Sequence, residues 1–224
     1  MDAEYQGLTF SRPGHATVRI ETDDGTVIYI DPWSEVIDGA PGDADVVFST
    51  HDDRDHYDSD AIEAVSSPET TVAVFEDIDA SALDVEVVSL APESETTVAG
   101  IGVRTVPAYN RADGPHLRPN GDPFHPKGTV IGLVLTIDGT TLYYPSDTDA
   151  LVELEAIEAD VVLPPIGGMA TMDQHEAATL VRQIGPALAL PLHYNTPQID
   201  GLDADPEEFK KVVEADSDIE VVLF

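Results

Sequence analysis

Four side chains that can bind a metal ion fall within six consecutive positions of the sequence. They are His51, Asp53, Asp55 and His56 in the segment THDDRDHYD. The apolar run VVFS comes directly before this segment and predicts a buried strand that ends in a tight loop. A catalytic divalent ion needs ligands that converge from several directions and one position open to water. His51 and Asp53 could face one ion, and Asp55 and His56 a second.

One loop cannot complete either coordination shell, so other strand ends must supply further ligands. Three candidates follow apolar, strand-like sequence: Asp31 in YIDPW, Asp147 in YYPSD and His193 in LPLHY. Each has an ordinary explanation when taken alone, because aspartates are typical turn residues and His193 could be a satisfied core histidine. Their shared place after predicted strands favours a common site.

The elements that would position these residues follow from hydrophobic periodicity. HATVRIETDDGTVIYIDP predicts a hairpin turned at residues 23–25, and GTVIGLVLTIDGTTLYYPSD a second hairpin turned at Asp138 and Gly139. Buried strands are predicted at 46–50 and in DVVLPP and ALALPLHY, and a closing strand in IEVVLF. Each half of the chain is therefore expected to form a hairpin-rich sheet followed by helix and strand.

Three helices are expected to cover these sheets. A short one follows Ser59, and a second lies in HEAATLVRQIG, with Thr171 and Gln174 forming a capping box and Gly185 ending it. The third lies in DPEEFKKVVEAD, with proline near its start. The predicted fold class is α/β (α+β), a four-layer αββα sandwich, and residues 1–224 are expected to form a single domain.

Residues 109–127 form the one long irregular segment, and such loops in compact domains are usually functional. The polar and aromatic residues in or beside it are Tyr109, Asn110, Arg111, His116, Arg118, His125 and Lys127. Its cations could attract an anionic substrate, and solvated loop charges are an equally good explanation. His175, in the predicted helix, is expected to face solvent.

Together these motifs resemble the metallo-β-lactamase superfamily, and within it the branch that includes L-ascorbate-6-phosphate lactonase-like proteins. The resemblance spans nearly the whole chain and implies the αββα metallo-β-lactamase fold. The matching segments, in the family's order, are PGHATVRI, IDPW, THDDRDHYD, VPAYN, FHPKG, YYPSDTD, GGMATMDQHEAA and LPLHY.

The resemblance also implies roles for individual residues. The family's metal loop reads His-x-His-x-Asp-His, which carries over to His51, Asp55 and His56 as ligands, while Asp147 would be the bridging carboxylate and His193 the last histidine. The implied reaction is attack by a metal-bound hydroxide on a carbonyl or phosphoryl centre, with Asp55 orienting it. Asp55 and His56 are therefore the candidate catalytic residues.

Two positions depart from the family pattern. Asp53 stands where the family usually has histidine, and Asn110 ends a strand that often supplies another; His125 or His116 could reach in instead. The added carboxylate should shift the preference of the first site from Zn²⁺ towards Mn²⁺ or Mg²⁺. We expect the chain to bind one or two divalent metal ions, and we expect zinc to be the favoured metal. Candidates for contacting the substrate or supporting the ligands are His15, Asp31, Asn110, His125 and Lys127.

Two classes of function follow from this constellation. The first is a metal-dependent hydrolase acting on a small ester, lactone or phosphodiester, with a small-molecule substrate as its partner. The second is a metal- or ligand-binding protein of the same fold with reduced or no catalytic activity, which the altered first site supports.

The composition also disfavours some classes of binding partner. Forty-four acidic residues against ten basic ones give a formal net charge of −34, while 42% hydrophobic residues predict a folded chain. Nucleic acid is disfavoured because phosphate neutralisation needs clustered Lys and Arg. Without a long apolar run or cysteine, we expect no membrane partner, no disulfides and a cytoplasmic protein. The oligomeric state is left open.

The scattered carboxylates favour a salt-accumulating cytoplasm, because high salt screens their mutual repulsion. We therefore expect the melting temperature to rise continuously from low to molar KCl, as measured by scanning calorimetry. A melting temperature that does not change over this range would rule out the dependence on salt.

Overall fold

The computed structural model describes residues 2–202 and 204–224, and in them two sheets of seven strands each. The strand order is β1 to β7 in the first sheet and β14 to β8 in the second, so each half of the chain builds one sheet. In both sheets a run of four antiparallel strands is followed by three strands added in parallel. The two halves therefore repeat one topology.

The bounds of the elements are as follows. The first sheet holds β1 Ala3–Tyr5, β2 Leu8–Gly14, β3 Thr17–Thr22, β4 Val27–Ile30, β5 Ala44–Ser49, β6 Ser66–Phe75 and β7 Glu86–Leu90. The second sheet holds β8 Glu95–Val98, β9 Ile101–Ala108, β10 Val130–Ile137, β11 Thr140–Tyr144, β12 Val161–Val162, β13 Leu188–Ala189 and β14 Glu220–Val221. The helices are α1 Ser59–Val65, the 3₁₀ helix η1 Val152–Ala156, α2 Gln174–Ile184 and α3 Pro206–Glu214.

The main apolar core lies between the two sheets. Side chains such as Phe10 and Phe48 from the first sheet and Leu133 and Leu135 from the second are fully buried in one cluster. Burying this apolar surface is the main favourable contribution to folding.

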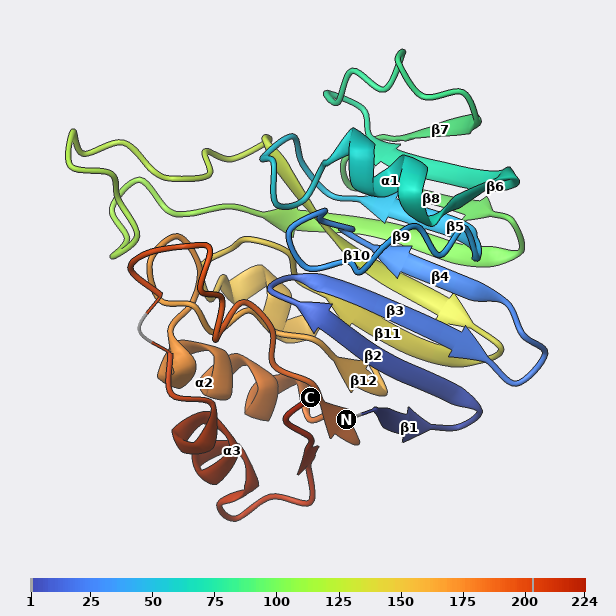
Figure 1. Cartoon of the computed structure of the whole chain (residues 1–224). Coiled ribbons are helices and arrows are strands. Elements are labelled where there is room, and N and C mark those ends of the chain that lie inside the picture. Colours follow the sequence, from blue (N-terminus) through green and yellow to red (C-terminus); the bar gives the residue numbers. More distant parts are fainter. Residues whose placement is uncertain (1, 203) are drawn as a thin grey trace.

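A second apolar cluster lies on the outer face of the second sheet. There Tyr143 packs with Leu180 of α2 and Phe209 of α3, while α1 packs on β6 of the first sheet. Figure 1 shows α1 on one side of the sheets and α2 and α3 on the other. The predicted αββα sandwich is confirmed.

Both predicted hairpins are present. β3 and β4 pair antiparallel across the turn at residues 23–25, and β10 and β11 pair across Asp138 and Gly139. Asp138 has φ 49° and Gly139 φ 86°, the positive values that a two-residue hairpin turn of this kind requires at both positions.

The predicted helix starts need correction. The capping box of α2 is formed by Asp173 and Glu176, not by Thr171 and Gln174. Asp173 accepts hydrogen bonds from the backbone of the first turn, whereas the Thr171 hydroxyl is buried and donates to the carbonyl of Met172. Similarly, α1 is capped by Asp58, the residue before Ser59.

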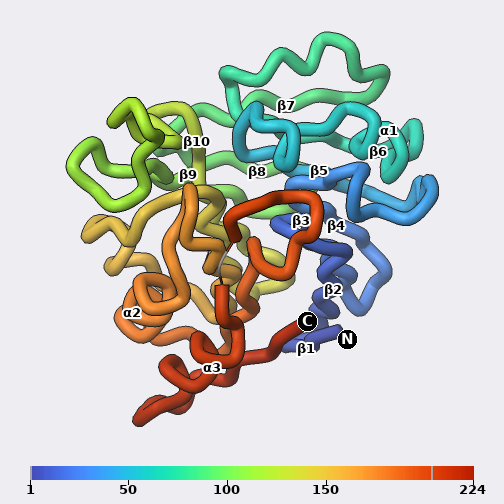
Figure 2. The backbone as a smooth tube through the Cα atoms, turned by 60° about the vertical axis from the view of Figure 1, so that its left-hand side comes forward, coloured from blue at the N-terminus to red at the C-terminus, as the bar shows by residue number. Residues whose placement is uncertain are grey.

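The loops that carry the candidate residues gather at one end of the sandwich. The turn after β2, the loop after β5 and the long loop after β9 come together there with the segments after β11 and β13 (Figures 1 and 2). The carboxyl ends of parallel strands share one edge of a sheet, which explains why residues so distant in sequence meet. Among the described residues no helix is long and apolar enough to cross a membrane.

Candidate metal centre

The loop after β5 is a compact turn that presents four predicted ligands in different directions. The backbone N–H groups of His56 and Tyr57 both donate to the carbonyl of Asp53, each at 2.8 Å. His51 and Asp53 lie in one candidate ligand group and Asp55 and His56 in another. His51 and His56 also lie close together, with ring centroids 4.1 Å apart, and form a third candidate group with Asp147.

The first ligand group consists of His51, Asp53 and His125, whose ligand atoms lie within 4.8 Å of one another. Asp53 Oδ2 is 3.2 Å from His125 Nε2 and 3.7 Å from His51 Nε2. His125 Nε2 also lies 3.6 Å from Asp147 Oδ2. The loop after β5 has no imidazole at position 53. His125, in the long loop after β9, supplies one instead.

The second ligand group consists of Asp55, His56 and His193, together with His15. His56 Nε2 lies 3.7 Å from Asp55 Oδ2. Asp147 Oδ1 is 3.3 Å from His56 Nε2 and 3.3 Å from His193 Nε2. Because its other oxygen faces His125, Asp147 stands between the two groups, in the position of a bridging carboxylate.

The buried atoms at the centre fit a metal ion. His51 Nε2, His56 Nε2, His193 Nε2 and Asp147 Oδ1 are buried and have no hydrogen-bond partner among the described residues. Buried polar groups are normally paired, and leaving several unpaired at one place is costly. Imidazole nitrogens and carboxylate oxygens that converge in this way form the donor set of a divalent transition metal.

The electrostatics of the centre also favour a cation. Burial lowers the pKa of His56, but the negative charges of Asp147, Asp31 and Asp55 outweigh it and raise the pKa to about 10. Burial raises the pKa of Asp147, and the neighbouring imidazoles His193 and His56 outweigh it and hold the pKa well below its usual range. A positive charge placed here is therefore strongly stabilised.

Asp31 orients His56 from behind. It is fully buried and accepts hydrogen bonds from His56 Nδ1 at 2.7 Å, from Tyr144 OH at 2.8 Å, and from the backbone and hydroxyl of Thr50. The bond to Nδ1 fixes the tautomer so that Nε2 is free for a metal ion. Asp31 thus supports a ligand and is itself outside the ligand groups.

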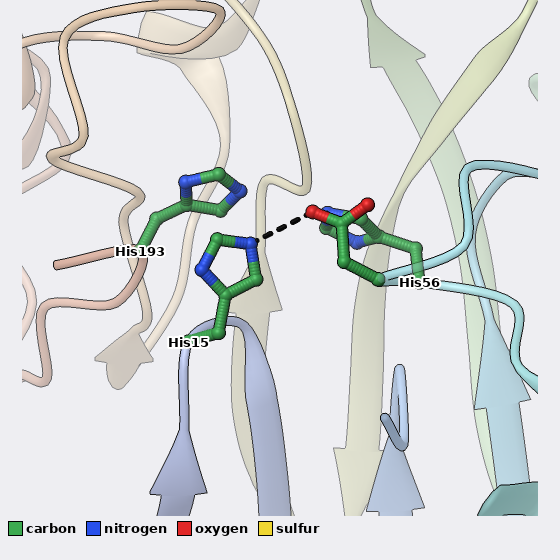
Figure 3. A group of neighbouring side chains, drawn as sticks. His15, His56 and His193 are labelled. Carbon is green, nitrogen blue, oxygen red and sulfur yellow. Dashed lines mark hydrogen bonds and ion pairs between the residues drawn. The ribbon is translucent and has the colours of Figure 1, made fainter. Parts of the chain in front are cut away.

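His15 lies in the turn between β2 and β3 and touches the second group, as Figure 3 shows. Its Nε2 is 2.8 Å from Asp55 Oδ2, its Nδ1 is 3.0 Å from Thr196 Oγ1, and its ring centroid is 3.8 Å from that of His193. Burial and the charge of His193 lower the pKa of His15 to about 4, so its imidazole is neutral. His15 therefore holds Asp55 and the segment after β13 in place.

Asn110 lies outside the ligand groups and shapes the long loop. Its side-chain amide donates to Asp149 Oδ1 at 2.8 Å and to the carbonyl of Ala170 at 2.9 Å. Its oxygen accepts from the backbone N–H of His125 at 2.9 Å. Asn110 therefore positions the residue that supplies the imidazole.

Two other loop residues lie away from the ligands. His116 Nδ1 is 2.7 Å from Asp149 Oδ1, and its Nε2 is 3.4 Å from Glu176 of α2. Lys127 lies over the ring of Tyr109, 5.1 Å from its centroid. His175 is exposed on α2, as expected.

Sequence reasoning did not assign a role to Asp149, Thr196 or Tyr144. Asp149 is visible as a second acidic residue in the segment SDTD, two positions after Asp147. Thr196 and Tyr144 carry no such signal, because each acts through one hydroxyl whose partner is set by the packing of distant segments.

Comparison with known proteins agrees with this fold and centre. A family model described as the beta-lactamase superfamily domain matches residues 9–193. The chain is 32% identical over 217 residues to a protein of Methanosphaerula palustris named UPF0173 metal-dependent hydrolase, and the match covers 94% of each chain.

Two solved structures are similar over nearly the whole chain. One, from Parabacteroides distasonis, has a TM-score of 0.84 at 27% identity and covers 100% of this chain and 97% of that one. The other, the metallo hydrolase Igni18 from Ignicoccus hospitalis, has a TM-score of 0.78 at 25% identity, covering 97% and 94%.

The αββα sandwich with a histidine and aspartate cluster at one end defines a metal-binding protein of the metallo-β-lactamase fold. The chain belongs to the metallo-β-lactamase superfamily.

The two ligand groups predict two metal ions per chain. Elemental mass spectrometry on protein purified without chelator should find about two ions in the wild type and about one in His125→Ala, because only the first group loses an imidazole. His175→Ala, which removes an exposed histidine, should retain both. Two ions in His125→Ala would show that this residue is not a ligand.

His116 should make the stability of the long loop depend on pH. Burial lowers its pKa, but the bond to Asp149 and the charges of Glu176 and Asp173 raise the pKa above the ordinary 6.5. The stabilisation is therefore fully present below the unfolded value and is lost as pH rises through the folded one.

At pH 6 we expect the free energy of unfolding of the wild type to be about 1.5 kcal/mol higher than that of His116→Gln. This is the low end of the range for a hydrogen bond to a charged group. Denaturant titrations should show that this difference in free energy of unfolding becomes smaller as the pH is raised to 9. His175→Gln serves as the matched control and should show no gap. A His116→Gln gap that is the same at both pH values would contradict the prediction.

Proposed function

We propose that the chain is a metal-dependent hydrolase that acts on a small ester, lactone or phosphodiester. The observation that carries the proposal is the position of Asp147, whose two oxygens face two separate ligand groups. The relative from Methanosphaerula palustris is named a metal-dependent hydrolase, which supports the same activity. A lactone is among the proposed substrates because the sequence resembles L-ascorbate-6-phosphate lactonase-like proteins.

Different residues of the chain have different roles in this proposed reaction. Divalent ions, when bound, supply Lewis acidity and lower the pKa of a coordinated water. His51, Asp53 and His125 would hold one ion and Asp55, His56 and His193 the other, and Asp147 could contribute an oxygen to each.

Asp55 is the one ligand of the second group that reaches solvent, with 24% of its side chain exposed. Burial raises its pKa, but His56 and His15 outweigh this and keep the pKa below its usual range. Asp55 is therefore ionised at neutral pH and can accept a hydrogen bond from the attacking water while His15 fixes its position.

We propose zinc as the metal. With His125 in place, each ligand group offers two imidazoles and two carboxylates, counting Asp147 in both. This set suits zinc in either group. Manganese or magnesium is the alternative for the first group, because Asp53 adds an oxygen ligand there.

The substrate we propose is a small anionic molecule. Four of the ten basic residues lie in the two loops beside the centre: Arg54, Arg111, Arg118 and Lys127. Their number in so acidic a chain supports an anionic substrate, whereas the charge of −34 speaks against nucleic acid or an anionic membrane surface as partner. We further propose a high-salt cytoplasm as the working environment, because salt would screen that charge.

The alternative function is metal or ligand binding without catalysis. It is supported by Asp53, which places a carboxylate where the family pattern has histidine and so reduces the Lewis acidity of the first ion. A measurement of turnover distinguishes a hydrolase from a protein that only binds a metal or ligand.

The test removes the metal with EDTA in molar KCl, restores Zn²⁺, Mn²⁺ or Mg²⁺ separately, and assays a nitrophenyl ester, a γ-lactone and bis(4-nitrophenyl) phosphate. We expect metal-restored turnover, reduced about 100-fold or more in Asp55→Asn because proton handling by a positioned side chain contributes that much. The neighbouring exposed residue gives the control Asp52→Asn, which should retain the rate. Stoichiometric metal without turnover on any substrate would favour the binding protein.

A further inference from the structure

A cleft of about 470 Å³ opens beside the metal centre. Its walls come from three separate segments: the loop after β4, the metal loop and the segment after β13. The lining residues are Trp33, Glu35, Arg54, Asp55, Gln198 and Ile199. Because Asp55 belongs both to this cleft and to the second ligand group, a molecule in the cleft lies next to the reacting centre.

Trp33 forms a rigid wall of the cleft. Its carbonyl accepts hydrogen bonds from the backbone N–H groups of Val36 and Ile37, each at 3.1 Å, which fixes the turn that carries the indole. Its ring makes an edge contact with His15 at a centroid distance of 5.4 Å. The ring is mostly buried, with 6% of the residue exposed, and it contributes an aromatic surface to the lining of the cleft.

Arg54 is the cation of the cleft and is nearly free to move. Its side chain is 78% exposed, and its guanidinium lies 3.8 Å from Glu35, whose side chain is itself 49% exposed. An exposed pair at this distance contributes little stability. The guanidinium can therefore leave Glu35 and bind a carboxylate or phosphate through two parallel hydrogen bonds.

We propose that this cleft is the subsite that binds an anionic group of the substrate, a phosphate or carboxylate attached to an apolar part. Arg54 holds the anion in place of Glu35, and the apolar part packs on Trp33 and Ile199. This inference rests on the proposed function for its catalytic meaning, since it places the anion beside the bond to be cleaved. The recognition itself requires only binding.

Trp33 is the only tryptophan of the chain, so its fluorescence reports directly on the cleft. Zinc-loaded protein is titrated with phenyl phosphate and with neutral benzyl alcohol, at one KCl concentration that keeps every variant folded. We expect phenyl phosphate to change the emission in a saturable way. Arg54→Gln should weaken this binding about tenfold, as loss of a hydrogen bond to a charged group does, and should leave the neutral probe unaffected.

Two further variants separate this subsite from direct binding of the phosphate to zinc. Glu35→Gln removes the competing carboxylate and should tighten the binding of phenyl phosphate. Arg182→Gln, an exposed cation on α2, should change nothing. Equal affinity in the wild type and Arg54→Gln, or calorimetric binding without any change in emission, would overturn the inference.

The result does not depend on turnover. Binding that requires Arg54 in a protein without hydrolytic activity would leave the subsite intact and remove the proposed reaction. Hydrolysis of anionic substrates with the same KM in the wild type and Arg54→Gln would remove the subsite and leave the reaction. A rise in KM with kcat unchanged would support both.

Discussion

The structure at this end of the sandwich depends on compensating one buried negative charge, that of Asp147. Its carboxylate follows β11 and is buried, and its Oδ1 has no hydrogen-bond partner in the described part of the chain. A buried charge is tolerated only when it is paired or coordinates a metal. The surrounding imidazoles must therefore come from both halves: His51 and His56 follow a strand of the first sheet, and His125 and His193 follow strands of the second. The metal centre thus joins the two sheets as well as serving chemistry.

The same requirement explains how the centre accommodates Asp53. An imidazole is absent from the metal loop, and His125 supplies one from the long loop. That loop is held by Asp149, which accepts hydrogen bonds from Asn110, His116 and the backbone of Arg111. Because Asp149 lies two positions after Asp147, the loop and the bridging carboxylate are fixed by the same short segment. The first ligand group therefore depends on the conformation of the long loop after β9, which contributes no residue to the second group.

This difference also separates what the sequence could predict from what it could not. The strands, both hairpins and the positions of His51, His56, Asp147 and His193 follow from local signals, because each ligand comes after an apolar run or within one tight turn. The choice between His125 and His116 had no local signal, since both lie in an irregular segment whose path is set by Asn110 and Asp149. The α2 cap was misplaced for a related reason: Thr171 and Asp173 are both good capping residues, and packing buries the first.

The consecutive strand order has a consequence for biosynthesis. Every strand pairs with its neighbour in sequence in both sheets, so pairing can proceed in chain order as the chain leaves the ribosome. The first sheet is complete once β7 has emerged, whereas the ligands of the second ion are complete only when His193 has emerged. A nascent chain can therefore complete its first sheet well before the second ligand group is complete. The complete set of candidate ligands is therefore available only after the first sheet and most strands of the second have been made.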